Sequence, residues 1–183
     1  MPTLTKWSVD DYHQMIAKGI LVNRRCELIN GVIWDMPPEG NFHRFLNTRG
    51  VKYLRQKMAG KAEVFEAHPI TLSNSEPEPD IAIVKLPDTV YLNHHPYPED
   101  IYWVIEISDS TLSYDLEVKK AIYAQAGIKE YWVIDVNSRK IIVFRNPQNN
   151  DYISQQEMSD GVINPVAFPE VKIEVSRLVD IPS

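Results

Sequence analysis

The sequence predicts a mixed α/β (α+β) fold, in which a mixed β-sheet core is flanked by helices. Two strongly apolar runs, 102–107 and 131–135, are typical of buried central strands. Between them, 112–126 has helical spacing and is followed by Gly127, a natural helix terminator. A helix that joins two buried strands predicts a parallel crossover within a mixed sheet.

The N-terminal part is predicted to hold a helix, a hairpin and a second, longer helix. Ser8, with acidic residues two and three positions later, indicates a helix start. The segment 25–36 is expected to form an N-terminal β-hairpin, because Asn30-Gly31 separates two apolar runs. Asn41 is expected to cap a helix that runs to about Met58.

The remaining elements follow from apolar runs bounded by turn residues. Loops are expected at 73–79 and 86–100, where prolines interrupt the pattern. Further strands are expected at 62–67, 81–84 and 140–144 and, as a final pair, at 152–157 and 171–175.

Composition predicts a single globular domain over residues 1–183. Hydrophobic residues make up 44% and charged residues 24%, with a net charge of −6, so binding to a polyanion requires a local basic patch. The one cysteine, Cys26, excludes an intrachain disulfide and fits a reducing compartment. No apolar run approaches the ~20 residues that span a bilayer. We therefore expect a soluble, cytoplasmic protein without a membrane partner.

Two carboxylates stand where apolar residues are expected. Glu106 interrupts the most apolar strand, and Asp80 opens another strand directly after Pro79. A buried carboxylate is unfavourable unless a cation or hydrogen-bond donors accompany it. Such a pair suits a hard cation such as Mg²⁺, which binds carboxylate oxygens. The structural alternatives are a buried ion pair for Glu106 and a turn role for Asp80.

Lys119 is the third element of this pattern. It lies on the inward stripe of the helix 112–126, three residues after Leu116 and four before Tyr123. A lysine there requires an anion, and Glu106 lies on the strand that leads into this helix. It is a candidate to orient or activate an attacking water, or to stabilise charge on a phosphate. The alternative is a lysine that pairs locally with Asp115, at i−4.

Glu27 and His43 are further candidates. Glu27 lies in the apolar strand of the hairpin and is interpreted as an additional metal ligand or as the orienter of a base. The alternative is an edge-strand charge that pairs with a neighbouring arginine. His43 lies in the first turn of its helix and is a contact candidate or a packed residue. His94 and His95 lie in a proline-rich loop without metal-ligand spacing, and we expect no chemical role for them.

The stretch 42–62 carries six basic residues and no acidic one. On a helix, Arg44, Lys52 and Arg55 form a basic face that suits a phosphate backbone, with His43 beside it as a candidate DNA contact. The alternative is an ordinary solvated helix face.

In their order, these residues resemble the "putative restriction endonuclease" family, long catalogued as a domain of unknown function within the PD-(D/E)XK nuclease superfamily. The resemblance covers about residues 5 to 180. It is carried by Glu27 in its hairpin, Pro79-Asp80, Glu106, Lys119, and above all the run from Tyr123 to Asp135.

The resemblance implies a restriction-endonuclease-like fold and a metal site. Asp80, Glu106 and the carbonyl of Ile107 would hold Mg²⁺ or Mn²⁺, and Glu27 matches an additional N-terminal acid. Superfamily members normally have a lysine two residues after the second acid. Ser108 occupies that position here, and the resemblance assigns the lysine's work to Lys119. Asp109 is a further departure, where family members often have proline.

The predicted function is a metal-dependent endonuclease that hydrolyses phosphodiester bonds in DNA. Two alternatives remain open: a catalytically inactive nuclease fold that binds DNA or protein, and a hydrolase of another phosphate ester. Beyond Mg²⁺ or Mn²⁺, no cofactor is expected. DNA is the expected partner, and cleavage of both strands favours a homodimer.

Overall fold

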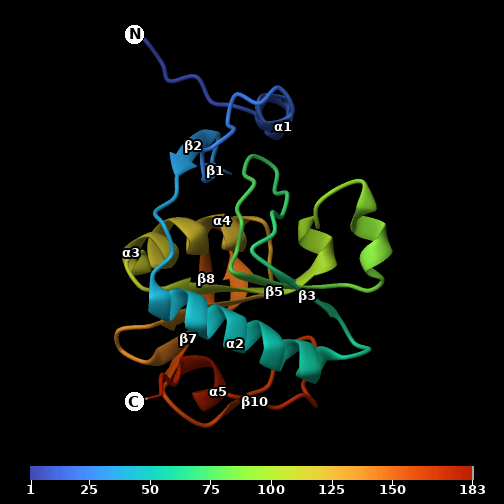
Figure 1. Cartoon of the computed structure of the whole chain (residues 1–183), viewed down its shortest axis with the longest axis vertical. Coiled ribbons are helices and arrows are strands. Elements are labelled where there is room, and N and C mark those ends of the chain that lie inside the picture. Colours follow the sequence, from blue (N-terminus) through green and yellow to red (C-terminus); the bar gives the residue numbers. More distant parts are fainter. Residues whose placement is uncertain (183) are drawn as a thin grey trace.

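A six-stranded mixed sheet forms the centre of the protein, as the computed structural model of residues 1–182 shows (Figure 1). Its strand order is β3-β4-β5-β6-β7-β8, and all neighbours are antiparallel except β5 and β6. The mixed α/β class is therefore confirmed. The strands are β3 (Glu63–Glu66), β4 (Ile81–Val84), β5 (Ile101–Ser108), β6 (Glu130–Asp135), β7 (Lys140–Gln148) and β8 (Asp151–Met158).

The crossover from β5 to β6 is helical and joins two parallel strands, as predicted. It consists of α3 (Leu112–Tyr114), a π-helical turn (Asp115–Lys119) and α4 (Lys120–Gln125). Gly127, at a φ of +77°, ends it. The sequence predicted one continuous helix, because side-chain types at helical spacing do not reveal where the bonding shifts from i−4 to i−5.

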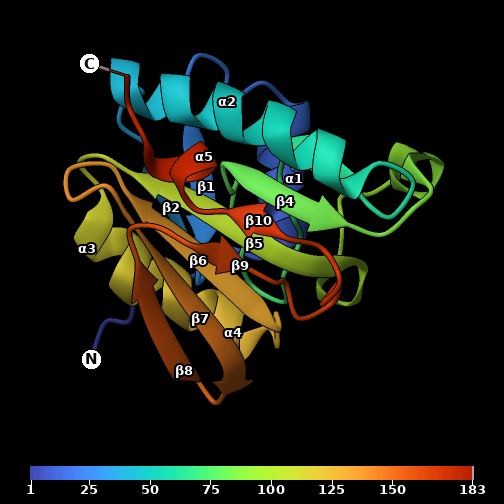
Figure 2. The same ribbon diagram turned by 90° about the horizontal axis from the view of Figure 1, so that it is seen from below.

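Helices and short strands cover the two faces of the sheet. On one face lie α2 (Asn41–Met58), α5 (Ser176–Val179) and the small pair β9 (Val162–Ile163) and β10 (Ile173–Glu174), as Figure 2 shows. The other face packs against α4. Strand β5 alternates between these layers, since Ile105 and Ile107 belong to the core beneath α2 and Val104 to the core beneath α4. Glu106 therefore lies on the α4 face.

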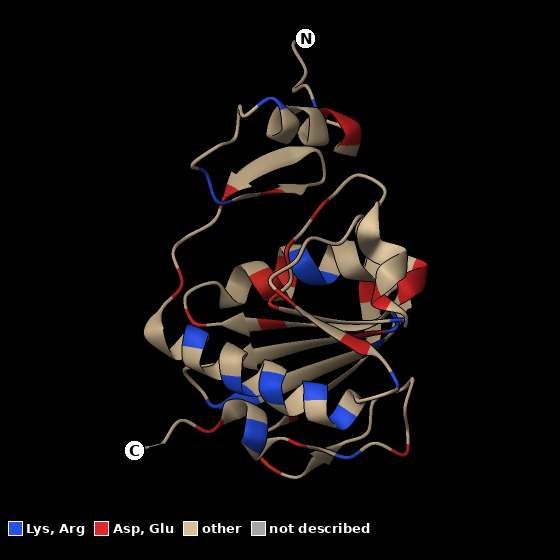
Figure 3. Ribbon diagram, turned by 45° about the vertical axis from the view of Figure 1, so that its right-hand side comes forward, with Lys and Arg blue, Asp and Glu red and all other residues tan. Residues whose placement is uncertain are grey.

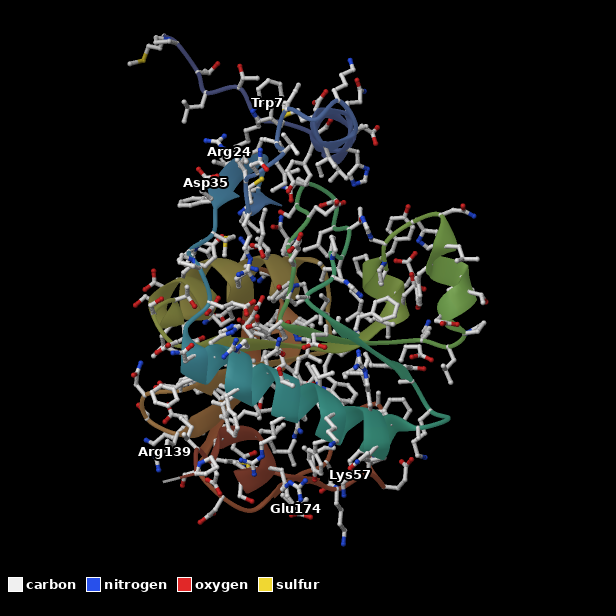
Figure 4. The ribbon with its side chains drawn as sticks, viewed as in Figure 1. Trp7, Arg24, Asp35, Lys57, Arg139 and Glu174 are labelled. Atoms are coloured by element: carbon white, nitrogen blue, oxygen red, sulfur yellow. The ribbon has the colours of Figure 1, made fainter. Side chains whose placement is uncertain are left out.

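A helix and a hairpin stand beyond the sheet, at the top of Figure 1: α1 (Val9–Ala17), β1 (Cys26–Ile29) and β2 (Val32–Asp35). Ser8 caps α1 with a reciprocal bond to Asp11. The turn residues Asn30 and Gly31 have φ of +51° and +76°, the left-handed pair that a tight hairpin requires. At the open end of the hairpin, Arg24 and Asp35 lie 3.4 Å apart (Figure 4). The N-terminal hairpin is thus confirmed.

Two further predicted details are wrong. The cap of α2 is Gly40, which has extended backbone angles, whereas Asn41 is already helical. The segments 152–157 and 171–175 do not pair with each other. Instead β8 pairs with β7 through a tight turn at 149–150, and β10 pairs with β9. Asn149, at a φ of +57°, forms this tight turn. Pairing between neighbouring strands is favoured because closing a short loop costs less conformational entropy than closing a long one.

None of the helices described in residues 1–182 combines the length and the apolar character that a membrane crossing requires.

Candidate active site

Asp80 and Glu106 meet where β4 begins and β5 nears its end. The backbone N–H of Asp80 donates to Glu106 Oε2 at 3.3 Å, and the N–H of Ile107 donates to Asp80 Oδ2 at 2.7 Å. Antiparallel pairing of the two strands fixes this arrangement, because Ile81 lies opposite Ile105. Both carboxylates are buried, with 8% and 5% of the residue exposed.

Lys119 joins Glu106 to Glu27. Its Nζ lies 3.1 Å from Glu106 Oε1 and 2.9 and 2.8 Å from the two oxygens of Glu27. The lysine is 1% exposed, so it does not extend to solvent. The local pairing with Asp115 is not formed. The Asp115 carboxylate instead accepts hydrogen bonds from the hydroxyls of Ser108 and Thr111, each at 2.7 Å.

Glu27 reaches this cluster from the hairpin. It is 3% exposed, and its Oε1 also accepts a hydrogen bond from the backbone N–H of Glu78 at 2.9 Å. Its neighbours Arg24 and Arg25 pair elsewhere, with Asp35 and Glu39. The interpretation of Glu27 as an edge-strand charge with an arginine partner is therefore wrong.

Tyr123 belongs to the same cluster and was missed by sequence reasoning. Its hydroxyl donates to Glu106 Oε1 at 2.6 Å, and the side chain is fully buried. The available signal was its position on the helix stripe, four residues after Lys119. We interpreted that stripe as apolar, and a tyrosine suits either role because it combines a large ring with a polar tip.

Burial disfavours the ionised forms of Glu106 and Lys119, whereas the opposite charges beside them favour those forms. Burial raises the pKa of Glu106 above its usual value, whereas the Lys119 cation lowers it and favours the ionised carboxylate. Burial also opposes the charge on Lys119, but Glu106 and Glu27 outweigh it and raise the pKa of the lysine above its usual value. Lys119 therefore stays a cation in neutral solution.

His43 enters the site from the first turn of α2. Its Nε2 lies 3.0 Å from Asp80 Oδ2, and its buried Nδ1 has no hydrogen-bond partner in the described part of the chain. Burial lowers the pKa of this imidazole, but the hydrogen bond and charge of Asp80 outweigh burial and raise it. His43 thus faces the acidic cluster, and the exposed basic residues lie on a different face of α2.

The cluster opens into a small pocket of about 70 Å³. A water molecule needs roughly 10–15 Å³ of such space, so the pocket can hold an ion with several waters. Seven carboxylates line it, against two permanently cationic side chains, Arg25 and Lys119. The seven are Glu27, Glu39, Glu78, Asp80, Glu106, Asp109 and Asp115.

The donor set of this pocket fits a hard divalent cation. Both hydrogen bonds of the Asp80 carboxylate use Oδ2, which leaves Oδ1 without one among residues 1–182. Strand geometry also turns the carbonyl of Ile107 toward Asp80, since the N–H and C=O of one residue point to the same neighbouring strand. The next carbonyl, of Ser108, accordingly binds Val136 on the opposite side. Carboxylate and carbonyl oxygens are the ligands that Mg²⁺ and Mn²⁺ prefer.

The basic face of α2 begins beside this pocket. Gly40 and His43, at the start of the helix, line the pocket, while Arg44, Lys52 and Arg55 are exposed further along (Figure 3). Arg55 also donates to the carbonyl oxygen of Val64 at 3.3 Å. Asp109, the departure noted in the sequence, lies against Gly40, where a Cβ would stand 2.5 Å from its Oδ2.

Comparison with known proteins gave two matches. The profile of the family described as "Putative restriction endonuclease" (Uma2) matches residues 9–176. A solved structure described as a putative nuclease of the DUF820 family, from Anabaena variabilis ATCC 29413, is similar with a TM-score of 0.69 and 16% sequence identity. The similarity covers 94% of this chain and 97% of that one, and it shows a shared fold. No curated protein matched.

Proposed function

The chain belongs to the Uma2 family of "Putative restriction endonuclease" proteins, and we propose that it is a Mg²⁺- or Mn²⁺-dependent endonuclease that hydrolyses phosphodiester bonds in DNA. One observation carries the proposal: seven carboxylates and a buried lysine surround a pocket of ion-binding size. A phosphate is repelled by such a pocket unless a multivalent cation offsets the negative charge.

Asp80, Glu106 and the carbonyl of Ile107 are the proposed metal-holding groups. A bound divalent ion supplies a water of lowered pKa and neutralises charge on the scissile phosphate. Lys119 remains protonated, so we assign to it the orientation of the attacking water and the stabilisation of phosphate charge. Glu27 and Tyr123 are positioning residues, because Glu27 holds Lys119 and Tyr123 holds Glu106.

We assign the backbone of DNA to the basic face of α2. Lys52 and Arg55 lie nine and twelve residues beyond His43, which corresponds to roughly 14 and 18 Å along a helix. A duplex that follows α2 from the pocket therefore meets Arg44 first and then these two residues. This extended surface favours a polynucleotide over a small phosphate ester.

The second candidate is a nuclease fold that binds nucleic acid without cleaving it. Ser108 at the usual lysine position favours it, as does the way in which two carboxylates already engage Lys119. The two candidates share the DNA surface and differ only in turnover, so a cleavage assay separates them.

The test is conversion of supercoiled plasmid with Mg²⁺ or Mn²⁺ and with EDTA. The wild-type protein is expected to cut only with metal, and Asp80→Asn to lower cleavage at least 100-fold, because it removes one metal-holding charge. Asp160→Asn, an exposed carboxylate in a turn, is the matched control and keeps wild-type activity. A wild-type protein that binds plasmid and never cuts it favours the second candidate.

We further infer a cytoplasmic enzyme that acts as a homodimer. The only cysteine, Cys26, is a buried free thiol, which suits a reducing compartment. One pocket cuts one strand, and two copies of the chain therefore provide for a double-strand break.

A further inference from the structure

A second cluster of chemical groups lies at α1, away from the candidate active site. Glu76 is 2% exposed, and the ring nitrogens of two histidines approach it from other segments. His13 comes from α1 and His95 from the loop before β5. One ligand atom from each of these three residues lies within 4.8 Å of the other two.

Glu76 is fixed in place before any ligand binds. Its backbone pairs with Leu28 of the hairpin, through a hydrogen bond of 2.7 Å. Its carboxylate accepts a hydrogen bond from the Thr71 hydroxyl at 2.9 Å and lies 2.6 Å from His13 Nε2. Such support holds a carboxylate in one orientation, as carboxylate ligands of metals require.

One histidine is enough to pair with this carboxylate, yet a second one faces it. His95 Nε2 lies 3.8 Å from Glu76 Oε1, which is too far for a hydrogen bond. Burial lowers the pKa of His95, and the nearby rings of His13, His68 and His94 act in the same direction, against Glu76. A neutral imidazole is the form that binds metals.

Small rotations of the two histidine rings would bring these groups to the spacing that an ion requires. Zinc binds imidazole nitrogen at roughly 2.0–2.1 Å, so two ligands on one ion lie about 3.3 Å apart. The observed separations of 2.6 and 3.8 Å lie on either side of that value, so rotations of two partly exposed rings suffice. A hollow lined by all three residues connects the cluster to the surface.

From this arrangement we propose that His13 Nε2, His95 Nε2 and the Glu76 carboxylate form a binding site for a transition-metal ion such as Zn²⁺, with water as the fourth ligand. Two nitrogen donors distinguish it from the all-oxygen active-site pocket, since imidazole favours zinc and its neighbours over magnesium. The ion joins α1 to the segment that carries Glu76 and to the loop that carries His95, and it stabilises the packing of all three.

The experiment measures Zn²⁺ binding and thermal unfolding of the full chain. We expect the wild-type protein to bind zinc and to unfold at a higher temperature when zinc is present, because a ligand of the folded state stabilises it. His13→Ala and His95→Ala should each weaken zinc binding at least tenfold and remove the thermal shift. Both side chains are 44% exposed, so these variants are expected to fold.

Two controls make the result specific. His94→Ala should bind zinc like the wild type, because that ring stacks on Tyr97 and is not one of the three grouped ligand side chains. Asp80→Asn should also bind zinc normally, because the active-site pocket is separate. The proposal is overturned if the wild-type protein binds no zinc, if the His13 and His95 variants retain full affinity, or if Asp80→Asn alone abolishes binding.

Discussion

Lys119 is a cation enclosed by two carboxylates, and this makes it a structural residue as well as a candidate catalytic one. We expect Lys119→Met to lower the free energy of unfolding by about 3–5 kcal/mol, because it leaves Glu27 and Glu106 buried without a counter-charge. Urea denaturation measures this change.

Lys120→Met is the control for that prediction, since the neighbouring lysine pairs with the exposed Asp151 at 2.8 Å. Its effect should remain below about 1 kcal/mol, as is usual for surface ion pairs. Equal losses for the two variants contradict the buried role of Lys119. Adding Glu27→Gln to Lys119→Met should restore part of the stability, because one buried charge is removed.

Tyr123 and Tyr131 provide a matched pair of buried hydroxyls with different acceptors. Tyr123 donates to the Glu106 carboxylate, and Tyr131 to the backbone carbonyl of Asp115 at 3.0 Å. Tyr123→Phe should destabilise the protein by about 1.5–3 kcal/mol and Tyr131→Phe by about 0.5–1.5 kcal/mol, because bonds to charged groups are stronger. Thermal and urea unfolding test this order, and the reverse order contradicts it.

Individual residues could be predicted from the sequence when their chemistry disagreed with the local pattern. Glu106 and Lys119 interrupt apolar stretches, so each was identified by its own neighbours. Contacts between distant segments leave no such mark. Nothing near His13 in the sequence points to Glu76 or His95, and the interpretation of His95 as a residue without chemistry rested on chain spacing alone.

At the scale of elements, the π-helical turn carries Lys119, the candidate active-site lysine. Asp115 and Lys119 both face inward across this turn, while Glu117 between them is exposed. Deletion of Glu117 should convert the turn to regular helix and rotate one side of it by about 100° relative to the other. We expect plasmid cleavage to be lost while circular dichroism shows the helix retained.

Glu117→Ala keeps the number of residues and provides the control for this deletion. It should cleave plasmid like the wild-type protein, because the side chain points to solvent. Full activity of the deletion variant shows that the wider turn does not position Lys119.

Secondary structure was predictable where a turn needs backbone angles that few residue types adopt. Asn30-Gly31 fixed the hairpin and Gly127 the end of the crossover, since both need left-handed backbone angles. Partner choice among the last strands was not predictable from short apolar runs. Register and pairing there depend on the turn at Asn149, whose preference is weaker than that of glycine.

At the scale of the whole molecule, negative net charge and a basic helix have opposite effects on the proposed binding of DNA. Lys52→Glu with Arg55→Glu should weaken duplex binding. It should also lower the salt dependence of the binding constant by an amount that corresponds to about two ionic contacts, because counterion release follows the number of phosphates neutralised. Fluorescence anisotropy over a range of salt concentrations measures both quantities.

A second double variant, Lys85→Glu with Lys129→Glu, makes the same change in net charge at the opposite end of the sheet from Asp80. It should affect binding much less. If the two double variants lose affinity equally, overall charge governs binding and the face of α2 has no special part in it.

The span of the ion-pair cluster also has a consequence during protein synthesis. Lys119 and Glu27 are separated by 92 positions in the chain. A ribosome therefore delivers Glu27 and Asp80 first, Glu106 later and the lysine last, and a domain folds as a unit once its chain has emerged. An unfinished chain holds acidic groups without their cation, so the ion-pair cluster, and with it the proposed active site, cannot assemble. Under the proposed function, the nascent polypeptide therefore leaves nearby nucleic acid uncut until the crossover helix has formed.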